Sequence, residues 1–281
     1  MSPPDGAPNP AVRGPARAAL PVASLVGAAM FLWPFLGAGR PAAASAAGFG
    51  VGTATALAAV ELAAGRLDTR RLALLAALSA IDAAARAVVV TGIGGFSPIF
   101  LLILCGGYVF GAEYGFLLGA TTMVVSALAT GGLGPWLPYQ LFAVGWVGAL
   151  AGIAGRRRTG RPTRRDAVVL AVVGVVTGYG FGAAMDVWNW TFYQSSPGLG
   201  FRAGMPFGEA LAHFARFYVL TSFVYDTFRA VGNAVMIGVL GLPVLVALAR
   251  LRARLQASVV ASADPTALGA GGPALPPVEQ T

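Results

Sequence analysis

Few side chains in this sequence could do acid–base or metal chemistry, and most of them lie within long apolar stretches. Asp82 and Arg86 stand four residues apart in a stretch that reads as one helix, so they share a side of it and could pair. Asp226 and Arg229, three residues apart, offer a second pair. A charge at membrane depth is costly unless it is paired or faces the bundle interior. Each pair is therefore either a structural ion pair or part of a binding site.

The parts that common intramembrane enzymes need are missing from the sequence. There is one histidine, His213, and one cysteine, Cys105, and neither an HExxH nor a GxSxG motif occurs. Asp82, Asp186 and Asp226 could form a carboxylate pair, but no GxGD-like context surrounds them. Without a GxxxxGK[ST] loop the chain has no means of cradling the phosphates of ATP. We expect no catalytic residue, no cofactor and no metal site, and we interpret Cys105 as a packing residue.

The composition indicates that these residues are positioned by membrane-spanning helices. Of the 281 residues 57% are hydrophobic and only 11% are charged, with a mean hydropathy of +0.73. This leaves too little polar surface to cover a soluble globule, and the apolar runs are too long for barrel strands. The expected fold class is therefore all-α, a polytopic transmembrane helical bundle. The net charge of +8 comes from arginines at the ends of apolar runs, which is a topology signal and does not indicate nucleic-acid binding.

About eight spans are expected. We place them near 18–39, 43–64, 71–92, 97–111, 114–131, 137–155, 166–188 and 229–250. If all eight cross, the main arginine clusters fall on one side, which predicts a multi-pass plasma-membrane protein with both termini cytoplasmic. The long outer segment 189–228, which holds His213 and ends in a predicted helix from 208 to 228, is either a lid or an interfacial connector.

Aromatic and polar side chains gather at the expected outer ends of the spans. The connection GGLGPWLPYQ supplies flat apolar area with hydrogen-bonding ends, suited to a flat or macrocyclic ligand, although aromatic belts use the same residue types. The end of the seventh span and the start of the eighth should converge beside it. The candidate substrate-binding residues are Arg86, Trp136, Tyr139, Gln140, Trp188, Asn189, Trp190, Arg229 and Asn233.

The stretch SALATGGLGPWLPYQLFAVGWVGALAGIAG, residues 126–155, resembles the substrate-binding S components of energy-coupling factor (ECF) transporters, especially an actinobacterial type. The likeness extends from FLWPFLGAGR near residue 30 to the arginine-rich end of the last span near residue 255. It includes GFSPIFLLILCGGYVFGAEYGFLLGA and TSFVYDTFRAVGNAVMIGVLGLPVLVALARLRAR. The motifs consist of glycine, proline, tryptophan and small residues, and their order and spacing carry the resemblance.

This resemblance implies a domain organisation. Residues 67–255 would form a six-helix S-component core, preceded by two extra transmembrane helices in 17–66 and flanked by disordered cytoplasmic tails at 1–16 and 256–281. If only the core forms the site, a chain without residues 1–64 should still bind its ligand.

The resemblance also implies partners. These are a transmembrane coupling subunit, two cytoplasmic ATP-binding-cassette ATPases, a small-molecule micronutrient and the lipid bilayer. Small side chains on the first core helix would form the interface with the coupling subunit, and here they are Ala73, Ala77, Ala80 and Ala84. The alternative is that this small-residue face packs against the chain's own helices.

The implied function is capture of a micronutrient at the outer face and its delivery inward. A vitamin such as cobalamin or another corrinoid is the leading guess for the substrate, and riboflavin or another vitamin-like compound is the alternative. An intramembrane enzyme and a non-transporting membrane scaffold are the competing classes. Binding to a vitamin panel and co-purification with ATPases would discriminate between them.

Overall fold

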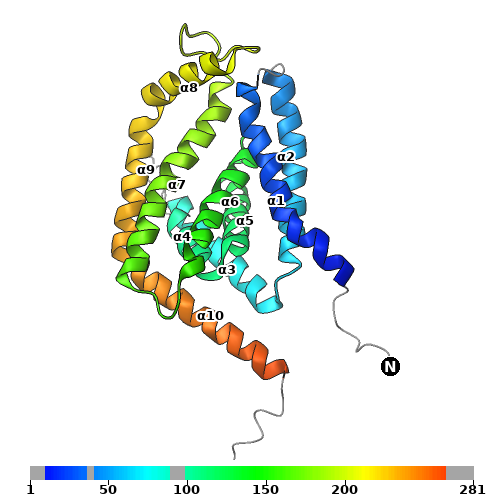
Figure 1. The fold of residues 1–281 in the computed structure, drawn as a ribbon, viewed down its shortest axis with the longest axis vertical. Coiled ribbons are helices and arrows are strands. Elements are labelled where there is room, and N and C mark those ends of the chain that lie inside the picture. Colours follow the sequence, from blue (N-terminus) through cyan, green and yellow to red (C-terminus); the bar gives the residue numbers. More distant parts are fainter. Residues whose placement is uncertain (1–9, 37–40, 89–98, 264–281) are drawn as a thin grey trace, which may run out of the picture.

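The structure is a computed structural model that describes residues 10–36, 41–88 and 99–263 (Figure 1). Within these ranges every regular element is a helix, which confirms the predicted helical membrane bundle. The helices are α1 (Pro10–Leu32), α2 (Pro41–Ala64), α3 (Thr69–Val88), α4 (Ile99–Phe110), α5 (Ala112–Thr130), α6 (Leu137–Ala154), α7 (Arg164–Trp190), α8 (Phe207–Thr221), α9 (Phe223–Met236) and α10 (Leu242–Ala263). Helix α1 begins and α10 ends within stretches expected to be disordered tails. The rest of those tails, 1–9 and 264–281, lies outside the described residues.

Membrane-spanning length is clearest in the second half of the described chain. Four apolar segments there are long enough to cross a bilayer: Ala112–Thr130, Leu137–Arg157, Arg164–Trp190 and Phe223–Ala257. Shorter apolar helices run over Leu20–Phe35, Gly50–Leu62 and Phe100–Phe110. Helix α3 has 20 residues but carries several charged side chains, so length qualifies it while composition does not.

The last span begins earlier than predicted. The expected helix over 208–228 breaks at Ser222, where α8 ends and α9 begins. Helix α9 then continues through the π-helical turn Ile237–Gly241 into α10. The apolar and aromatic run is continuous across the break, so hydrophobicity alone did not reveal the change of direction.

Glycines hold the centre of the bundle together. Gly115 of α5 and Gly148 of α6 face each other so closely that a Cβ added to either would overlap the carbonyl oxygen of the other. A Cβ on Gly107 of α4 would also overlap the Gly148 carbonyl, and one on Gly119 would overlap that of Val144. Small residues let helix backbones approach in lipid, where dispersion replaces the hydrophobic drive. Helices α4, α5 and α6 therefore form a tightly packed core.

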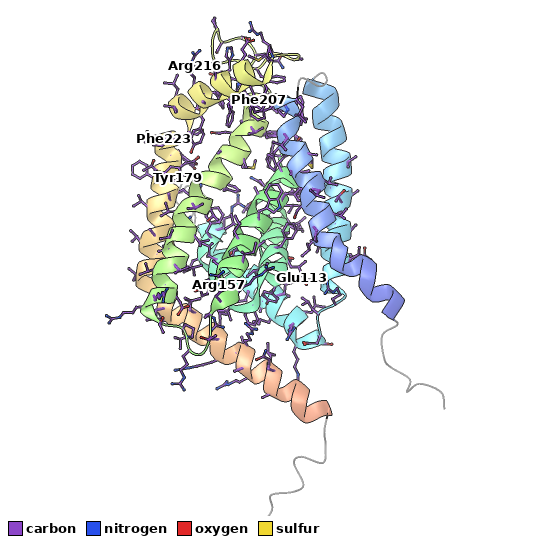
Figure 2. The ribbon with its side chains drawn as sticks, in the orientation of Figure 1. Glu113, Arg157, Tyr179, Phe207, Arg216 and Phe223 are labelled. Carbon is purple, nitrogen blue, oxygen red and sulfur yellow. The ribbon has the colours of Figure 1, made fainter. Side chains whose placement is uncertain are left out.

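The remaining helices surround this core (Figure 1). Helices α7 and α9 lie on one flank and α1 and α2 on the other, while α8 lies across one end and α10 projects from the opposite end. Figure 2 labels Arg216 and Phe207 at the end that α8 covers, and Arg157 and Glu113 at the opposite end. We call the latter the arginine-rich end, because Arg156, Arg157 and the exposed arginines after them gather there.

Helix α8 is fastened to the bundle by an aromatic cluster. The fully buried Trp190 donates its indole N–H to the Leu199 carbonyl at 2.7 Å and stacks on Phe35, with ring centroids 5.6 Å apart. The buried His213 has its Nδ1 3.0 Å from the Gly200 carbonyl oxygen, which makes it a structural residue of this end.

Candidate functional site

The interior of α3 and α5 carries polar side chains that have no protein partner. Ser79 and Asp82 on α3, and Thr122 and Ser126 on α5, are each at most 1% exposed. Both carboxylate oxygens of Asp82 and the hydroxyls of the other three lack a hydrogen-bond partner among the described residues. Buried polar groups in native proteins are nearly always hydrogen-bonded. We call these four residues, which lie on two helices that pack together, the polar chamber.

Other hydroxyls within the helices of this chain are hydrogen-bonded to their own backbone. Thr130, Thr177 and Thr221 each donate to the carbonyl four residues earlier in their own helix, at 2.7 to 2.8 Å. This bond satisfies a hydroxyl inside a helix without any outside partner. Thr122 and Ser126 make no such bond. Their hydroxyls therefore have no hydrogen-bond partner among the described residues.

Arg86 does not pair with Asp82, so that part of the sequence prediction is wrong. The Arg86 guanidinium instead donates to Met123 Sδ at 3.1 Å, across to α5. A spacing of four residues places two side chains on one side of a helix, but the long arginine side chain can turn to a neighbouring helix. Asp82 points inward, within electrostatic range of the buried Cys105 on α4.

Aromatic side chains from α6, α7 and α1 meet toward the end that α8 covers. Trp188 lies 6.0 Å from Trp136 and 6.2 Å from Tyr139, measured between ring centroids. The Trp188 indole N–H is buried without a partner among the described residues, whereas that of Trp136 donates to the Gly132 carbonyl at 3.2 Å. Phe31 of α1 packs edge-on against Tyr139, at 5.2 Å. We call Trp136, Tyr139 and Trp188 the aromatic rim.

The remaining predicted site residues fall outside this arrangement. Trp190 belongs to the cluster under α8, Asn189 is exposed, and the half-buried Gln140 makes no side-chain hydrogen bond within the described chain. The structure therefore brings together Trp136, Tyr139 and Trp188 but not their neighbours in sequence.

A second polar network lies between α7 and α9. The predicted ion pair of Asp226 with Arg229 is formed, and the Arg229 guanidinium also lies 5.1 Å from the centre of the Phe181 ring. Asn233 faces the bundle interior as expected and donates to the Gly174 carbonyl of α7 at 3.0 Å. A Cβ on Gly182 would overlap the Asp226 carboxylate. These contacts tie α9 to α7, so Arg229 and Asn233 have partners within the protein.

Tyr218, which lies outside the spans, is next to the polar network between α7 and α9. Burial, and then the negative charge of Asp226, raise the pKa of Tyr218 on α8 above its usual value. Its hydroxyl therefore stays protonated as a hydrogen-bond donor, which suits its place beside two carboxyl groups, Asp226 and Asp186.

The small-residue face predicted on α3 is exposed. Ala73, Ala77, Ala80 and Ala84 all lie on the surface, as do Leu72 and Ile81 beside them, which are 43% and 58% exposed. No described helix of the chain covers this face. The buried side of α3, with Ser79 and Asp82, is the opposite one. One helix thus separates an open alanine face from the polar chamber.

Three chamber residues were missed by the sequence analysis. Ser79, Thr122 and Ser126 are ordinary residues in small-residue helices, and their complete burial without a hydrogen-bond partner among the described residues is what distinguishes them. Ser79 stands three residues before Asp82, and Thr122 stands four residues before Ser126, so each pair shares one face of its helix. This spacing indicates a polar face only weakly, because the chain is so rich in small residues. Among the described residues no group of three histidine, cysteine, aspartate or glutamate side chains could hold a metal ion.

Comparison with known proteins gives one match. The profile of the family described as "ECF transporter, substrate-specific component" matches residues 70–241, more than half of the chain. No curated protein and no solved structure matches the chain. Proteins of this family are multi-pass membrane subunits of transporters, not enzymes, and they work with a transmembrane coupling subunit and ATPases. The family match and the helical bundle agree, and the chain belongs to the substrate-specific components of ECF transporters.

Proposed function

We propose that this chain captures a micronutrient in the polar chamber beneath the aromatic rim and delivers it inward with a coupling subunit and two ATP-binding-cassette ATPases. The observation that carries the proposal is the set of buried side chains without protein partners: Ser79, Asp82, Thr122 and Ser126. A receptor needs such groups, because unsatisfied polar atoms reject any ligand that cannot pair with them.

The orientation of the chain follows from its arginines. The arginines at the arginine-rich end are Arg70 and Arg71 at the start of α3, Arg156 to Arg161 between α6 and α7, Arg164 and Arg165 at the start of α7, and Arg250 to Arg254 in α10. Cytoplasmic loops carry the excess of lysine and arginine in membrane proteins. We therefore place this end, with both termini, in the cytoplasm, and α8 with the aromatic rim outside.

The chemistry of the chamber favours a ligand rich in N–H donors. A carboxyl group and three hydroxyls offer mainly acceptors, and the rim offers flat apolar area with a free indole N–H on Trp188. A corrinoid such as cobalamin is the leading candidate, because its ring is broad and its edge carries amide groups. Riboflavin or another flat vitamin-like compound, whose ring also carries an N–H, is the alternative.

The exposed alanine face of α3 is the proposed interface with the coupling subunit. Small side chains allow close approach of two helix backbones within a membrane. Because the alanine face and the chamber lie on opposite sides of α3, this helix can contact the coupling subunit on one side and the micronutrient on the other. A scaffold that recruits a partner without transport would use the same face, so the partner's identity matters.

Co-purification tests this assignment. The double variant Ala73→Leu, Ala77→Leu should lose the coupling subunit and the ATPases while its ligand affinity is unchanged. The matched control is Ala54→Leu, Ala58→Leu, because these alanines are also exposed and four residues apart, on α2. Equal retention of the ATPases by both double variants would refute the assigned interface, and loss of ligand binding with the partners would refute its separation from the chamber.

A further inference from the structure

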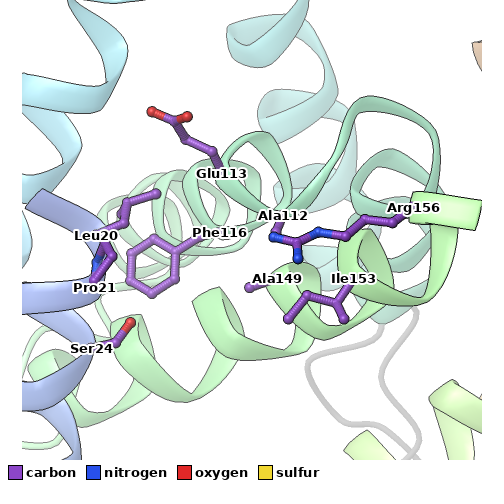
Figure 3. Close-up of a pocket in the computed structure, with 9 residues that line it drawn as sticks. All are labelled: Leu20, Pro21, Ser24, Ala112, Glu113, Phe116, Ala149, Ile153 and Arg156. Atoms are coloured by element: carbon purple, nitrogen blue, oxygen red, sulfur yellow. The ribbon is translucent and has the colours of Figure 1, made fainter. Parts of the chain in front are cut away.

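A crevice opens at the arginine-rich end, where α1 meets the α5–α6 pair. It has a volume of about 300 Å³ and is lined by Leu20 and Ser24 of α1, Glu113 and Phe116 of α5, Ile153 near the end of α6, and Arg156 just after α6 (Figure 3). We call it the α1 crevice. It shares only α5 with the polar chamber, and there its residues lie in the first turns of the helix, before Thr122 and Ser126.

The contacts that fasten α1 to the core begin beside the crevice and continue toward the α8 end. Toward the α8 end, Gly27 packs directly against Phe142, and Phe31 contacts Tyr139. Beside the crevice, Trp146 donates its indole N–H to Ser24 Oγ at 3.2 Å. Below it α1 leans away from the core (Figure 1).

The walls of the crevice are apolar and its edge is charged. Leu20, Phe116 and Ile153 supply side-chain carbon, while Arg156 reaches across above Ala112 and Glu113 stands on the other edge (Figure 3). This combination of apolar depth and a charged mouth fits an amphiphile, with its chain inside and its headgroup at the edge.

The balance of charge selects the headgroup. Glu113 is already paired, since its carboxylate accepts from Arg66 at 2.6 Å. Arg156 makes no hydrogen bond or ion pair with any residue that the structure describes, so its positive charge is uncompensated. Arginine is well suited to phosphate, because its planar guanidinium offers paired N–H donors.

We propose that the α1 crevice binds an anionic phospholipid, with one acyl chain between α1 and the α5–α6 pair and the headgroup phosphate on Arg156. The lipid would fill the gap that the chain itself leaves and fasten the cytoplasmic half of α1 to the core. The site is independent of the micronutrient chamber and of the alanine face. A general attraction of arginines to the negative inner leaflet differs from this proposal, because it would involve the neighbouring arginines equally.

Native mass spectrometry of the full-length protein in detergent tests the site. We expect one phosphatidylglycerol molecule to remain bound where phosphatidylcholine of the same chain length dissociates. Arg156→Gln should lower phosphatidylglycerol affinity by about five-fold or more, the effect of one basic side chain beside an anionic headgroup. The matched control is Arg157→Gln, because Arg157 is an equally exposed neighbour that does not line the crevice.

A second variant tests the apolar part. Ala149→Leu would fill the crevice from α6 and should remove the bound lipid without changing any charge. Glycerol phosphate, which has the anionic group but no acyl chain, should not raise the melting temperature of the protein, whereas phosphatidylglycerol should. The proposal is overturned if the two arginine variants lose affinity alike, if both lipids bind equally, or if glycerol phosphate stabilises as well as the lipid does.

Discussion

At the scale of single residues, the polar groups inside α3 and α5 distinguish this chain from a bundle that is only packed. The sequence drew attention to Asp82 because a charge within a span is rare, but it supplied the wrong partner, since spacing cannot show that Arg86 turns to Met123. It also overlooked Ser79 and Thr122, because a hydroxyl in a helix usually bonds its own backbone. By contrast, the pair of Asp226 with Arg229 was predictable, because both residues lie on one short stretch of helix.

The variant Asp82→Asn tests the role of this carboxyl group. The amide keeps the shape of the carboxyl group and leaves one acceptor oxygen in place of two, so the melting temperature should change little. Ligand affinity should fall by about 10- to 100-fold, the range for a lost hydrogen bond to a charged group of about 1.5–3 kcal/mol. Titration calorimetry and thermal unfolding measure the two effects. Glu61→Gln, on the exposed surface of α2, should change neither, and an Asp82→Asn protein that binds normally would remove Asp82 from the site.

At the scale of helices, the apolar runs predicted the spans well because length and composition are set by the bilayer. The starts of α4, α5 and α6 lie within two residues of those expected. The order of packing could not be predicted, because glycine is abundant throughout and its partners are set in three dimensions. Nor did the sequence reveal that the first, extra helix reaches the rim through Phe31 and the α8 cluster through Phe35. We therefore expect removal of residues 1–64 to weaken the site rather than leave it intact.

Substitution of Gly148 tests the close packing of α4, α5 and α6. Gly148→Leu places a side chain against the Gly115 backbone. It should lower the free energy of unfolding by about 3 kcal/mol or more, the upper end of the range that is typical of overpacking. Gly180→Ala is the control, because a Cβ at this α7 position meets nothing within 4 Å. Thermal unfolding in detergent should show a large drop for the first and no drop for the second. Equal stability of the two variants would contradict the packing described for this core.

At the scale of the whole molecule, the two ends of the bundle differ in the side chains and elements that they carry. The end covered by α8 carries the aromatic rim, and the arginine-rich end carries the loops and α10. Fold class and family were predictable from the sequence because hydropathy and glycine patterns extend over most of the chain. The chamber was not, because its residues lie about 40 apart in the sequence, on two helices that pack together only in the folded bundle.

The orientation can be measured with single cysteines, since Cys105 is the one native cysteine and is buried. A membrane-impermeant maleimide should label Ser195→Cys, in the exposed loop before α8, in intact cells. It should label Thr159→Cys, in the exposed loop after α6, only once the membrane is permeabilised. The reverse pattern would place the arginine-rich end outside and contradict the orientation that we propose.

The most direct test of the central claim is the binding of a vitamin panel, including cobalamin and riboflavin, to the full-length protein purified in detergent. The account predicts that one compound binds with one-to-one stoichiometry and a Kd of about 1 μM or tighter, about −8 kcal/mol. It also predicts that binding quenches tryptophan fluorescence through Trp136 and Trp188 of the rim. A folded protein that binds no member of a complete micronutrient panel with a Kd of about 1 μM or tighter would contradict the assignment as a high-affinity receptor.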